Sequence, residues 1–341
     1  MKTKGRKRVL VVGAGFAGGT ISNILSKKGF EIDIVEKRNH IAGNAFDYLD
    51  PSGIRIHKYG PHIFHTNNNK VVKFLSEFTE WIPYKHKVKA LLDNGELVTL
   101  PPNIETIKKV GEKNLINILF KPYSEKMWGM KFEELDKSII NRIPIRLDKN
   151  ENYFPKDKFQ KMPKDGYTKI FEKLLDSPFI NIYLNTEFDK KMEKNYLHVF
   201  NSMPIDEYYS FKYGELPYRS IKFHIKEEKK EKKFPVAQVN FTDDQKFTRV
   251  VEWKNFPNHG NTKKNILTYE EPCDYKENFL ERYYPVKDLK GENRNLYTKY
   301  SKIRNKKNTF IGRCGMYVYI DMHQAISSSM AIANKFLKDN K

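Results

Sequence analysis

The hydrophobic pattern at the start of the chain predicts a buried parallel strand that leads into a helix. Residues 9–12 form an unbroken apolar run, which is typical of a strand covered on both faces. Residues 20–28 then show helical periodicity, and residues 31–35 are predicted as a second strand. A strand, a helix and a second strand in this order predict the first unit of a doubly wound α/β sheet.

The turn between this strand and this helix carries the glycine pattern of dinucleotide-binding proteins. Gly13 permits a tight turn, Gly15 lets the backbone approach a pyrophosphate, and Gly18 lets the helix pack closely on the strand. The free N–H groups at the helix N-terminus favour phosphate. Glu36 ends the second strand about 20 residues beyond the glycines, where an acidic residue binds a ribose hydroxyl. These features predict a Rossmann-like nucleotide-binding domain.

Farther along the chain the pattern predicts both an antiparallel sheet and a return to the parallel one. Strand-like segments that follow one another without helices favour an antiparallel sheet, and they occupy residues 88–92, 96–100, 218–223, 237–241, 248–252 and 266–269. Three further short strands suit a return to the first sheet, at residues 180–184, 197–200 and 309–313. Helical periodicity marks residues 71–78, 104–120, 166–175 and a last helix that runs to about residue 338, with Asp321 as its N-cap.

Two stretches outside the glycine turn carry candidate chemistry. His57, His62 and His65 lie close together in the sequence, but their spacing fits no zinc signature, so we expect no metal there and place His62 on the floor of a pocket. Residues 121–130 are rich in aromatic and loop-prone residues, and Trp128 beside a glycine predicts a mobile stacking lid.

The composition narrows the class of partner. The 62 Lys and Arg against 42 Asp and Glu give a formal net charge of +20, which suits nucleic acid, an anionic membrane or a diphosphate substrate. No nucleic-acid motif is evident, and residues 226–233 alternate in sign, as a solvated loop does. No apolar run is long enough to cross a bilayer, and the basic start of the chain lacks the features of a signal peptide, so we expect a cytoplasmic protein.

The lack of familiar catalytic motifs indicates that a bound cofactor supplies the chemistry. The sequence contains no Gly-x-Ser-x-Gly elbow, no P-loop and no Cys-x-x-Cys, and Cys273 and Cys314 are too isolated for a disulfide framework. Guanidinium groups bind phosphate oxygens bidentately, so the candidate diphosphate ligands are Arg146, which lies in a strand-like stretch at residues 142–146, together with Arg249 and Arg313. Candidates for stacking and hydroxyl contacts are Trp128, Tyr153, Tyr284 and Tyr319.

Several longer motifs together resemble the UDP-galactopyranose mutase family, over most of the chain and in order. They are residues 36–41, 57–66, 123–129, 142–146, 218–220, 240–243, 283–286 and 321–324. The resemblance implies a discontinuous FAD-binding domain (1–80, 180–215 and 295–341), a short helical subdomain (103–142) and an antiparallel-sheet substrate domain (81–102, 143–179 and 216–294).

The resemblance also implies the roles of individual residues. FAD would be bound by Gly13, Gly15, Phe16, Ala17, Gly18, Glu36, Lys37, Asn44, His62, Ile63, Arg313, Asp321, Met322 and Gln324. The UDP-sugar would be bound by Tyr123, Trp128, Arg146, Tyr153, Asn240, Arg249, Glu270, Tyr284 and Tyr319. His62, Arg146 and Arg249 would be the catalytic residues.

The activity implied is the flavin-dependent interconversion of UDP-galactopyranose and UDP-galactofuranose, a step towards cell-surface polysaccharide. In this family N5 of reduced FAD attacks the anomeric carbon, UDP leaves, and the sugar ring opens and recloses. A cellular reductant such as NAD(P)H would keep the flavin reduced. The same chemistry on another nucleotide sugar, a flavin oxidoreductase of the same fold and a binding protein without turnover are the alternatives.

The sequence departs from the family pattern in one large way. Bacterial members carry a longer helical insert between the positions of Asn103 and Tyr123, which usually builds the dimer contact. Because the insert is much shorter here, both a homodimer and a monomer stay open. Smaller departures are Ile320 in place of an aromatic residue, Met203 in place of a glycine, and His86 near a substrate-side asparagine.

Overall fold

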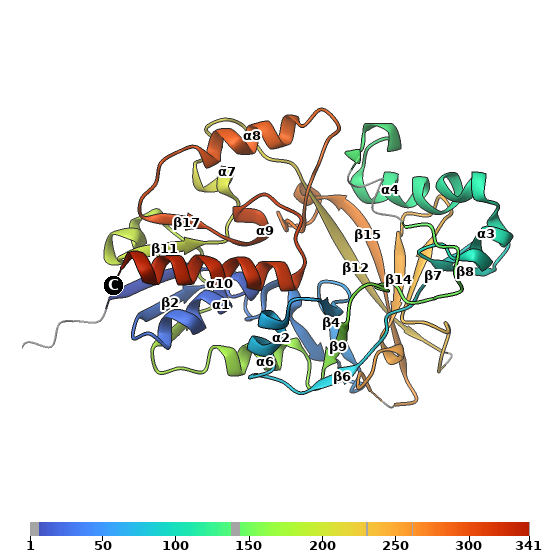
Figure 1. The fold of residues 1–341 in the computed structure, drawn as a ribbon, viewed down its shortest axis with the longest axis horizontal. Coiled ribbons are helices and arrows are strands. Elements are labelled where there is room, and N and C mark those ends of the chain that lie inside the picture. Colours follow the sequence, from blue (N-terminus) through green and yellow to red (C-terminus); the bar gives the residue numbers. More distant parts are fainter. Residues whose placement is uncertain (1–6, 138–143, 230, 261, 341) are drawn as a thin grey trace, which may run out of the picture.

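The computed structural model describes residues 7–137, 144–229, 231–260 and 262–340. A five-stranded parallel sheet lies at the left of the molecule in Figure 1, in the order β10-β2-β1-β11-β17. Its strands are β1 (Arg8–Val12), β2 (Glu31–Val35), β10 (Ile180–Tyr183), β11 (His198–Asn201) and β17 (Asn308–Phe310). The predicted return of three later segments to the first sheet is therefore confirmed.

Two helices from opposite ends of the chain cover this sheet together. Helix α1 (Phe16–Ser26) follows the glycine turn and packs along α10 (Met322–Asp339). Asp321 caps α10 through a capping box with Gln324, as the N-cap prediction requires. The last helix therefore returns its N-terminus to the region where the first helix begins (Figure 1).

A seven-stranded sheet occupies the right-hand half of Figure 1, in the order β16-β12-β15-β14-β13-β7-β8. Its strands are β7 (Val88–Leu91), β8 (Leu97–Leu100), β12 (Tyr218–Glu228), β13 (Gln238–Phe241), β14 (Arg249–Glu252), β15 (Asn265–Asp274) and β16 (Tyr284–Pro285). All neighbours are antiparallel except β7 and β13, which run parallel. The predicted hairpin and antiparallel strands are confirmed.

A short helical segment lies against one end of this sheet. It contains α3 (Ile104–Val110), a π-helical turn (Ile116–Phe120) and α4 (Lys121–Trp128). The prediction of a loop over residues 121–130 was wrong, because Pro122 favours the first turn of a helix and Gly129, at φ +65°, ends it in the left-handed conformation. Residues 144–146 form no strand, and Arg142 and Ile143 lie outside the described residues.

The remaining elements are small and connect the two large sheets. The strands are β3 (Asp47–Leu49), β4 (Arg55–His57), β5 (Phe64–Thr66), β6 (Trp81–Pro83) and β9 (Phe159–Pro163). The helices are α2 (Asn69–Leu75), α6 (Tyr167–Leu174), α7 (Ile205–Tyr208), α8 (Glu292–Ser301) and α9 (Gly312–Gly315). Short 3₁₀ turns occupy 43–45, 112–114, 132–134, 190–195, 253–255 and 275–277.

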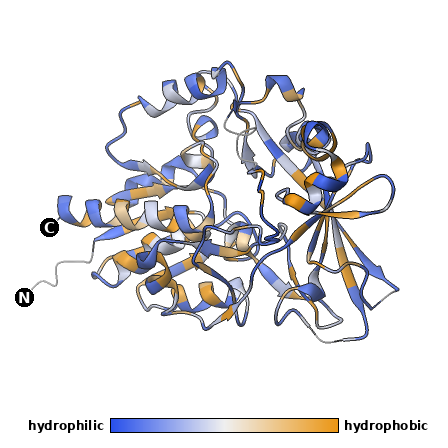
Figure 2. Ribbon diagram, turned by 45° about the vertical axis from the view of Figure 1, so that its right-hand side comes forward, coloured by the Kyte–Doolittle hydropathy of each residue, from blue (hydrophilic) through white to orange (hydrophobic). Residues whose placement is uncertain are grey.

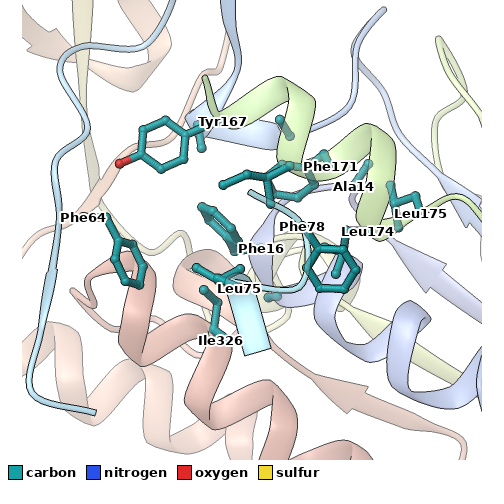
Figure 3. Packing of buried hydrophobic residues seen from close by; sticks show 14 of the residues in the cluster. Ala14, Phe16, Phe64, Leu75, Phe78, Tyr167, Phe171, Leu174, Leu175 and Ile326 are labelled. Atoms are coloured by element: carbon teal, nitrogen blue, oxygen red, sulfur yellow. The ribbon is translucent and has the colours of Figure 1, made fainter. Parts of the chain in front are cut away.

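An aromatic cluster fixes the start of α1 against α6. The Phe16 ring lies 4.7 Å from that of Phe171 and 6.2 Å from that of Tyr167, measured between ring centres. Figure 3 shows these rings converging on Phe16, with Leu75 and Ile326 on the other side. Burying such rings contributes about 1.5–3 kcal/mol each, so the position of the glycine turn is set by the core.

Apolar and polar residues are distributed as this packing requires. Figure 2 shows hydrophobic segments running through both sheets, whereas hydrophilic residues predominate on the outer helices and loops. Within the described ranges, the helices fall short of the length and apolar character needed to cross a bilayer.

Candidate active site

The glycine turn is packed so closely that a side chain would clash with neighbouring atoms of the protein. Gly13 has φ +96°, and a Cβ there would lie 2.1 Å from Ser202 Oγ. A Cβ on Gly18 would lie 2.0 Å from the Gly13 carbonyl oxygen, and one on Gly43 would lie 2.9 Å from Gly15 Cα. Only glycine permits this close packing, and Gly13, Gly15 and Gly18 line a cavity in front of the N-terminus of α1, where its backbone N–H groups can meet a ligand.

A cavity of about 330 Å³ extends from this turn along the carboxyl ends of the parallel strands. Most of the predicted cofactor residues line it: Gly13, Gly15, Phe16, Ala17, Gly18, Glu36, Lys37, Asn44, His62, Arg313, Asp321 and Met322. Two do not. Ile63 packs against the hydrophobic core, and the Gln324 side chain accepts the Asp321 backbone N–H at 2.9 Å.

The acidic residue at the end of β2 is held by the backbone. The Glu36 carboxylate accepts the Ala14 N–H at 2.9 Å and the Arg38 N–H at 3.0 Å. Beside it, Arg38 donates to Asn44 Oδ1 at 2.9 Å and forms an ion pair with Glu281. Because Glu36 is buried and fixed, its position at the cavity wall suits a ribose hydroxyl.

Sequence reasoning missed part of this cavity. The additional lining residues include Arg38, Thr186, Phe188, Ser202, Leu280 and Arg282. Thr186, Phe188 and Ser202 follow strands β10 and β11, and ligands of open α/β sheets bind at the carboxyl ends of strands. That rule could have found these three residues, whereas no local pattern marks the loop around Leu280.

His62 lies where the cavity approaches the antiparallel sheet. Its Nδ1–H donates to the Gly60 carbonyl at 2.8 Å, and its backbone N–H donates to His57 Nδ1 at 3.0 Å. Burial, assisted by the cations Arg313 and Arg249 and opposed by the hydrogen bond to Gly60, lowers the pKa of His62 to about 4. At neutral pH the ring is therefore uncharged, and Nε2 is left as an acceptor.

Asn240, Arg249 and Glu270 lie side by side on one face of the antiparallel sheet. Asn240 is opposite Arg249, and Arg249 is opposite Glu270, so the three side chains share a face. Arg249 Nε donates to Glu270 Oε2 at 2.6 Å. Among the described residues, nothing pairs with the buried Oε1 of Glu270.

Burial and charge act in opposite directions on this ion pair. Burial raises the pKa of Glu270, although Arg249 opposes the shift. Burial also disfavours the charge on Arg249, but Glu270 and the neighbouring Tyr123 and Tyr284 raise its pKa above the ordinary value. The guanidinium stays charged, and only its Nε is engaged by the described residues, so the two Nη groups can bind an anion.

Aromatic rings surround this charged pair. Tyr123 from α4 and Tyr284 from β16 belong to one cluster. Burial raises the pKa of Tyr284 to about 12 and also raises that of Tyr123, so both hydroxyls keep their protons at neutral pH. Tyr319 stacks on Tyr284 with ring centres 5.5 Å apart, and the Arg313 guanidinium lies 5.2 and 5.1 Å from these two ring centres. Arg313 thus joins the cavity to this cluster.

The segment that carries Trp128 is anchored to the sheet. Arg219 on β12 donates to the Met127 carbonyl at 2.9 Å and to the Lys126 carbonyl at 3.2 Å, at the C-terminus of α4. Lys126 in turn donates to the Asp243 and Phe247 carbonyls. Trp128 is half-buried in the same cluster as Tyr123. In the structure Trp128 is therefore a packed residue at a helix end, and not part of a free loop.

Two predicted substrate residues lie outside the strands, beside the β7–β8 hairpin. Arg146 donates to the Asn152 carbonyl at 2.8 Å and to the Pro101 carbonyl at 3.0 Å, so its Nη groups are occupied by the backbone. Tyr153 packs against the cluster around the β7–β8 hairpin, and its electrostatic effect reaches Tyr123. Tyr153 thus lies near the aromatic cluster of Tyr123 and Tyr284. Among the described residues, the structure shows no contact between Arg146 and Arg249.

The fold and the site define a nucleotide-cofactor protein with a second, cationic and aromatic site next to the cofactor cavity. Within the part of the chain that the structure describes, no three His, Cys, Asp or Glu side chains are grouped so as to hold a metal ion.

Comparison with known proteins identifies the family. A family model described as UDP-galactopyranose mutase matches residues 118–319, and one described as an NAD(P)-binding Rossmann-like domain matches residues 11–78. The UDP-galactopyranose mutase of Mycoplasma pneumoniae is 34% identical over 96% of this chain and 96% of its own length. The dTDP-fucopyranose mutase of Escherichia coli is 33% identical over 98% of this chain and 99% of its own.

A solved structure agrees in fold. Reduced UDP-galactopyranose mutase superimposes with a TM-score of 0.76 over 97% of this chain and 94% of its own, at 13% identity. The chain belongs to the UDP-galactopyranose mutase family, a family of isomerases.

Proposed function

We propose that the protein interconverts UDP-galactopyranose and UDP-galactofuranose, with FAD bound in the cavity at the carboxyl ends of the parallel strands. The observation that carries the proposal is the junction of two sites. His62 and Arg313 line the cofactor cavity, Arg313 also lies against Tyr284 and Tyr319 of the aromatic cluster, and the charged Arg249 guanidinium helps to lower the pKa of His62.

The residues present fit FAD. Gly13 makes a tight turn at φ +96°, Gly18 packs closely on β1, and both line the cavity together with Gly15, as expected where a pyrophosphate approaches backbone. Glu36, which would bind the adenosine ribose, lines the cavity, as do Arg313 and the N-terminus of α10. The chemistry that reduced FAD supplies when bound is a nucleophilic nitrogen for the anomeric carbon of the sugar, without net oxidation.

The chain's own residues would bind and orient the nucleotide sugar. The Nη groups of Arg249 bind the diphosphate and stabilise the charge that develops on it as the glycosidic bond weakens. Tyr123 and Tyr284 donate protonated hydroxyls next to that charge. Because α4 is anchored by Arg219, the helix keeps water from the reacting carbon.

A direct experiment tests this function. Purified protein with bound flavin is incubated with UDP-galactofuranose before and after reduction with dithionite or NAD(P)H. Appearance of UDP-galactopyranose only after reduction supports the proposal. Turnover by the oxidised protein with consumption of an electron acceptor would show an oxidoreductase instead, and bound flavin without conversion of any nucleotide sugar would show a binding protein.

A second candidate is the same isomerisation on another nucleotide sugar. It is favoured by the similarity to the dTDP-fucopyranose mutase, whose identity to this chain is close to that of the UDP-galactopyranose mutase. Sugar specificity can depend on a few pocket contacts. Parallel assays with UDP-galactopyranose, UDP-N-acetylgalactosamine and dTDP-fucopyranose separate the candidates by the ratio of their kcat/KM values.

A further inference from the structure

A series of hydrogen-bonded, buried polar side chains, here called the polar chain, continues from Arg249 and Asn240 towards the β7–β8 hairpin. Gln238 precedes Asn240 by two residues on β13, so both side chains project from the same face, and Gln238 Nε2 donates to Asn240 Oδ1 at 3.0 Å. Gln238 is 6% exposed. Its neighbour in the adjacent strand is Val88, and two residues before Val88 lies His86.

His86 extends this chain by one more link. Its side chain is hydrogen-bonded to that of Gln238, and its Nδ1 lies 3.2 Å from the hydroxyl of Tyr84. His86 is 2% exposed, and burial lowers its pKa to about 3. At neutral pH the ring is therefore uncharged and has one donor and one acceptor nitrogen.

The hydrogen bond from Gln238 to Asn240 sets the direction of the others. Because the amide nitrogen of Gln238 donates to Asn240 Oδ1, its carbonyl oxygen is the group left to accept from His86. The ring proton of His86 is accordingly assigned to Nε2, and Nδ1 then accepts from the hydroxyl of Tyr84. The Nε2–H of His86 then donates to the carbonyl oxygen of Gln238, and the amide of Gln238 donates onward to Asn240 Oδ1. The NH₂ group of Asn240 is consequently turned away from the chain and has no acceptor among the described residues.

We propose that Tyr84, His86 and Gln238 are positioning residues that fix Asn240 as a hydrogen-bond donor towards the substrate. The group recognised would be a sugar oxygen that accepts a hydrogen bond. This inference rests on the proposed function, because it places the sugar of the nucleotide beside Arg249, the direct neighbour of Asn240 across the two strands. Without these neighbours the Asn240 amide could present either its NH₂ group or its oxygen.

A variant that reverses the hydrogen bond between residue 238 and Asn240 tests the inference. In Gln238→Glu the carboxylate accepts from both His86 and the NH₂ group of Asn240, so the oxygen of Asn240 faces the substrate. The probes are UDP-galactopyranose and four analogues, each with one sugar hydroxyl replaced by fluorine, which can accept but cannot donate. Dissociation constants are measured at pH 8 on the flavin-loaded protein. We expect the fluorine analogue at one ring position to bind at least about tenfold more weakly to the variant than to the wild type, relative to the parent sugar nucleotide.

Two further variants keep the test informative if Gln238→Glu folds poorly. His86→Phe removes the donor to Gln238, so binding of UDP-galactopyranose should weaken severalfold while binding of UDP alone is unchanged. His86→Gln restores a donor and should recover the sugar affinity. The matched control is His224→Phe, because His224 is opposite Tyr269 in the strand register and so projects from the opposite face of the same sheet, where its ring contacts Glu271.

The outcomes distinguish this inference from the proposed function. Wild-type protein that binds none of the nucleotide sugars overturns both. Wild-type protein that binds them, with the same discrimination among fluorine analogues in Gln238→Glu and the same sugar affinity in His86→Phe, overturns only the inference.

Discussion

Removal of the Arg249 guanidinium tests how strongly this cation stabilises the buried, charged carboxylate of Glu270. In Arg249→Ala, Glu270 would remain fully buried without its cation. A buried carboxylate in that position takes up a proton. At pH 7, bringing a carboxyl group with an ordinary pKa of 4.5 to its neutral form costs about 3.4 kcal/mol, because each pKa unit corresponds to about 1.4 kcal/mol. This agrees with the loss of about 3–5 kcal/mol expected when a buried pair is broken.

The loss of stability in Arg249→Ala should increase as the pH rises. In the variant the folded protein keeps the proton on Glu270, since burial raises its pKa, whereas the unfolded chain releases it above about pH 4.5. The free energy of unfolding therefore falls by about 1.4 kcal/mol for each unit of rising pH. At pH 5 the deficit relative to the wild type should be below about 1 kcal/mol. The double variant Arg249→Ala/Glu270→Gln lacks the titrating group and should lose this slope.

Urea unfolding at pH 5, 6 and 7, followed by tryptophan fluorescence, measures the effect, because Trp253 is fully buried. Turnover should be abolished in both variants because the diphosphate has lost its guanidinium, while the flavin absorbance of the purified protein is retained. A deficit that does not change with pH would refute the electrostatic reasoning. Near-normal turnover by the double variant would refute the role of Arg249 at the diphosphate.

Three further predictions follow from single contacts. Gly18→Ala should abolish flavin binding, seen as a colourless protein, because the new Cβ would lie 2.0 Å from a backbone oxygen; a yellow variant would contradict this. Arg219→Ala frees the C-terminus of α4 and should raise the KM for the nucleotide sugar severalfold at unchanged flavin content; an unchanged KM would exclude this anchoring role. His57→Phe leaves the buried N–H of His62 without an acceptor and should lower the free energy of unfolding, measured in urea, by about 1–3 kcal/mol. A urea midpoint identical to that of the wild type would contradict this.

Local pattern was sufficient for the elements that position the cofactor. The apolar run at residues 9–12, the glycines and the strand-like segment at residues 31–35 predict β1, the turn and β2 with nearly the observed bounds. The hairpin at residues 88–100 was equally accessible, since its turn and its alternation are adjacent in sequence. Such elements are determined by neighbouring residues, so a single chain is enough to recognise them.

The same local rules failed where packing overrides composition. Residues 121–128 look loop-prone, yet they form α4 between Pro122 and Gly129, with partly buried aromatic side chains that pack near β12 and β16 and with last carbonyls that accept from Arg219. Trp128 beside a glycine suggests mobility in the sequence, whereas in the structure the glycine ends a helix.

By itself, the sequence determined the dinucleotide-binding turn, the order of the two sheets and, through its motifs, the family. Only the tertiary structure decided which side chains meet. Arg38 pairs with Glu281 across 243 positions of sequence, and the direction of the chain from Tyr84 to Asn240 depends on the register between β7 and β13. Strand register is a long-range property that shifts every side chain to the other face when it changes by one residue, and no local pattern records it.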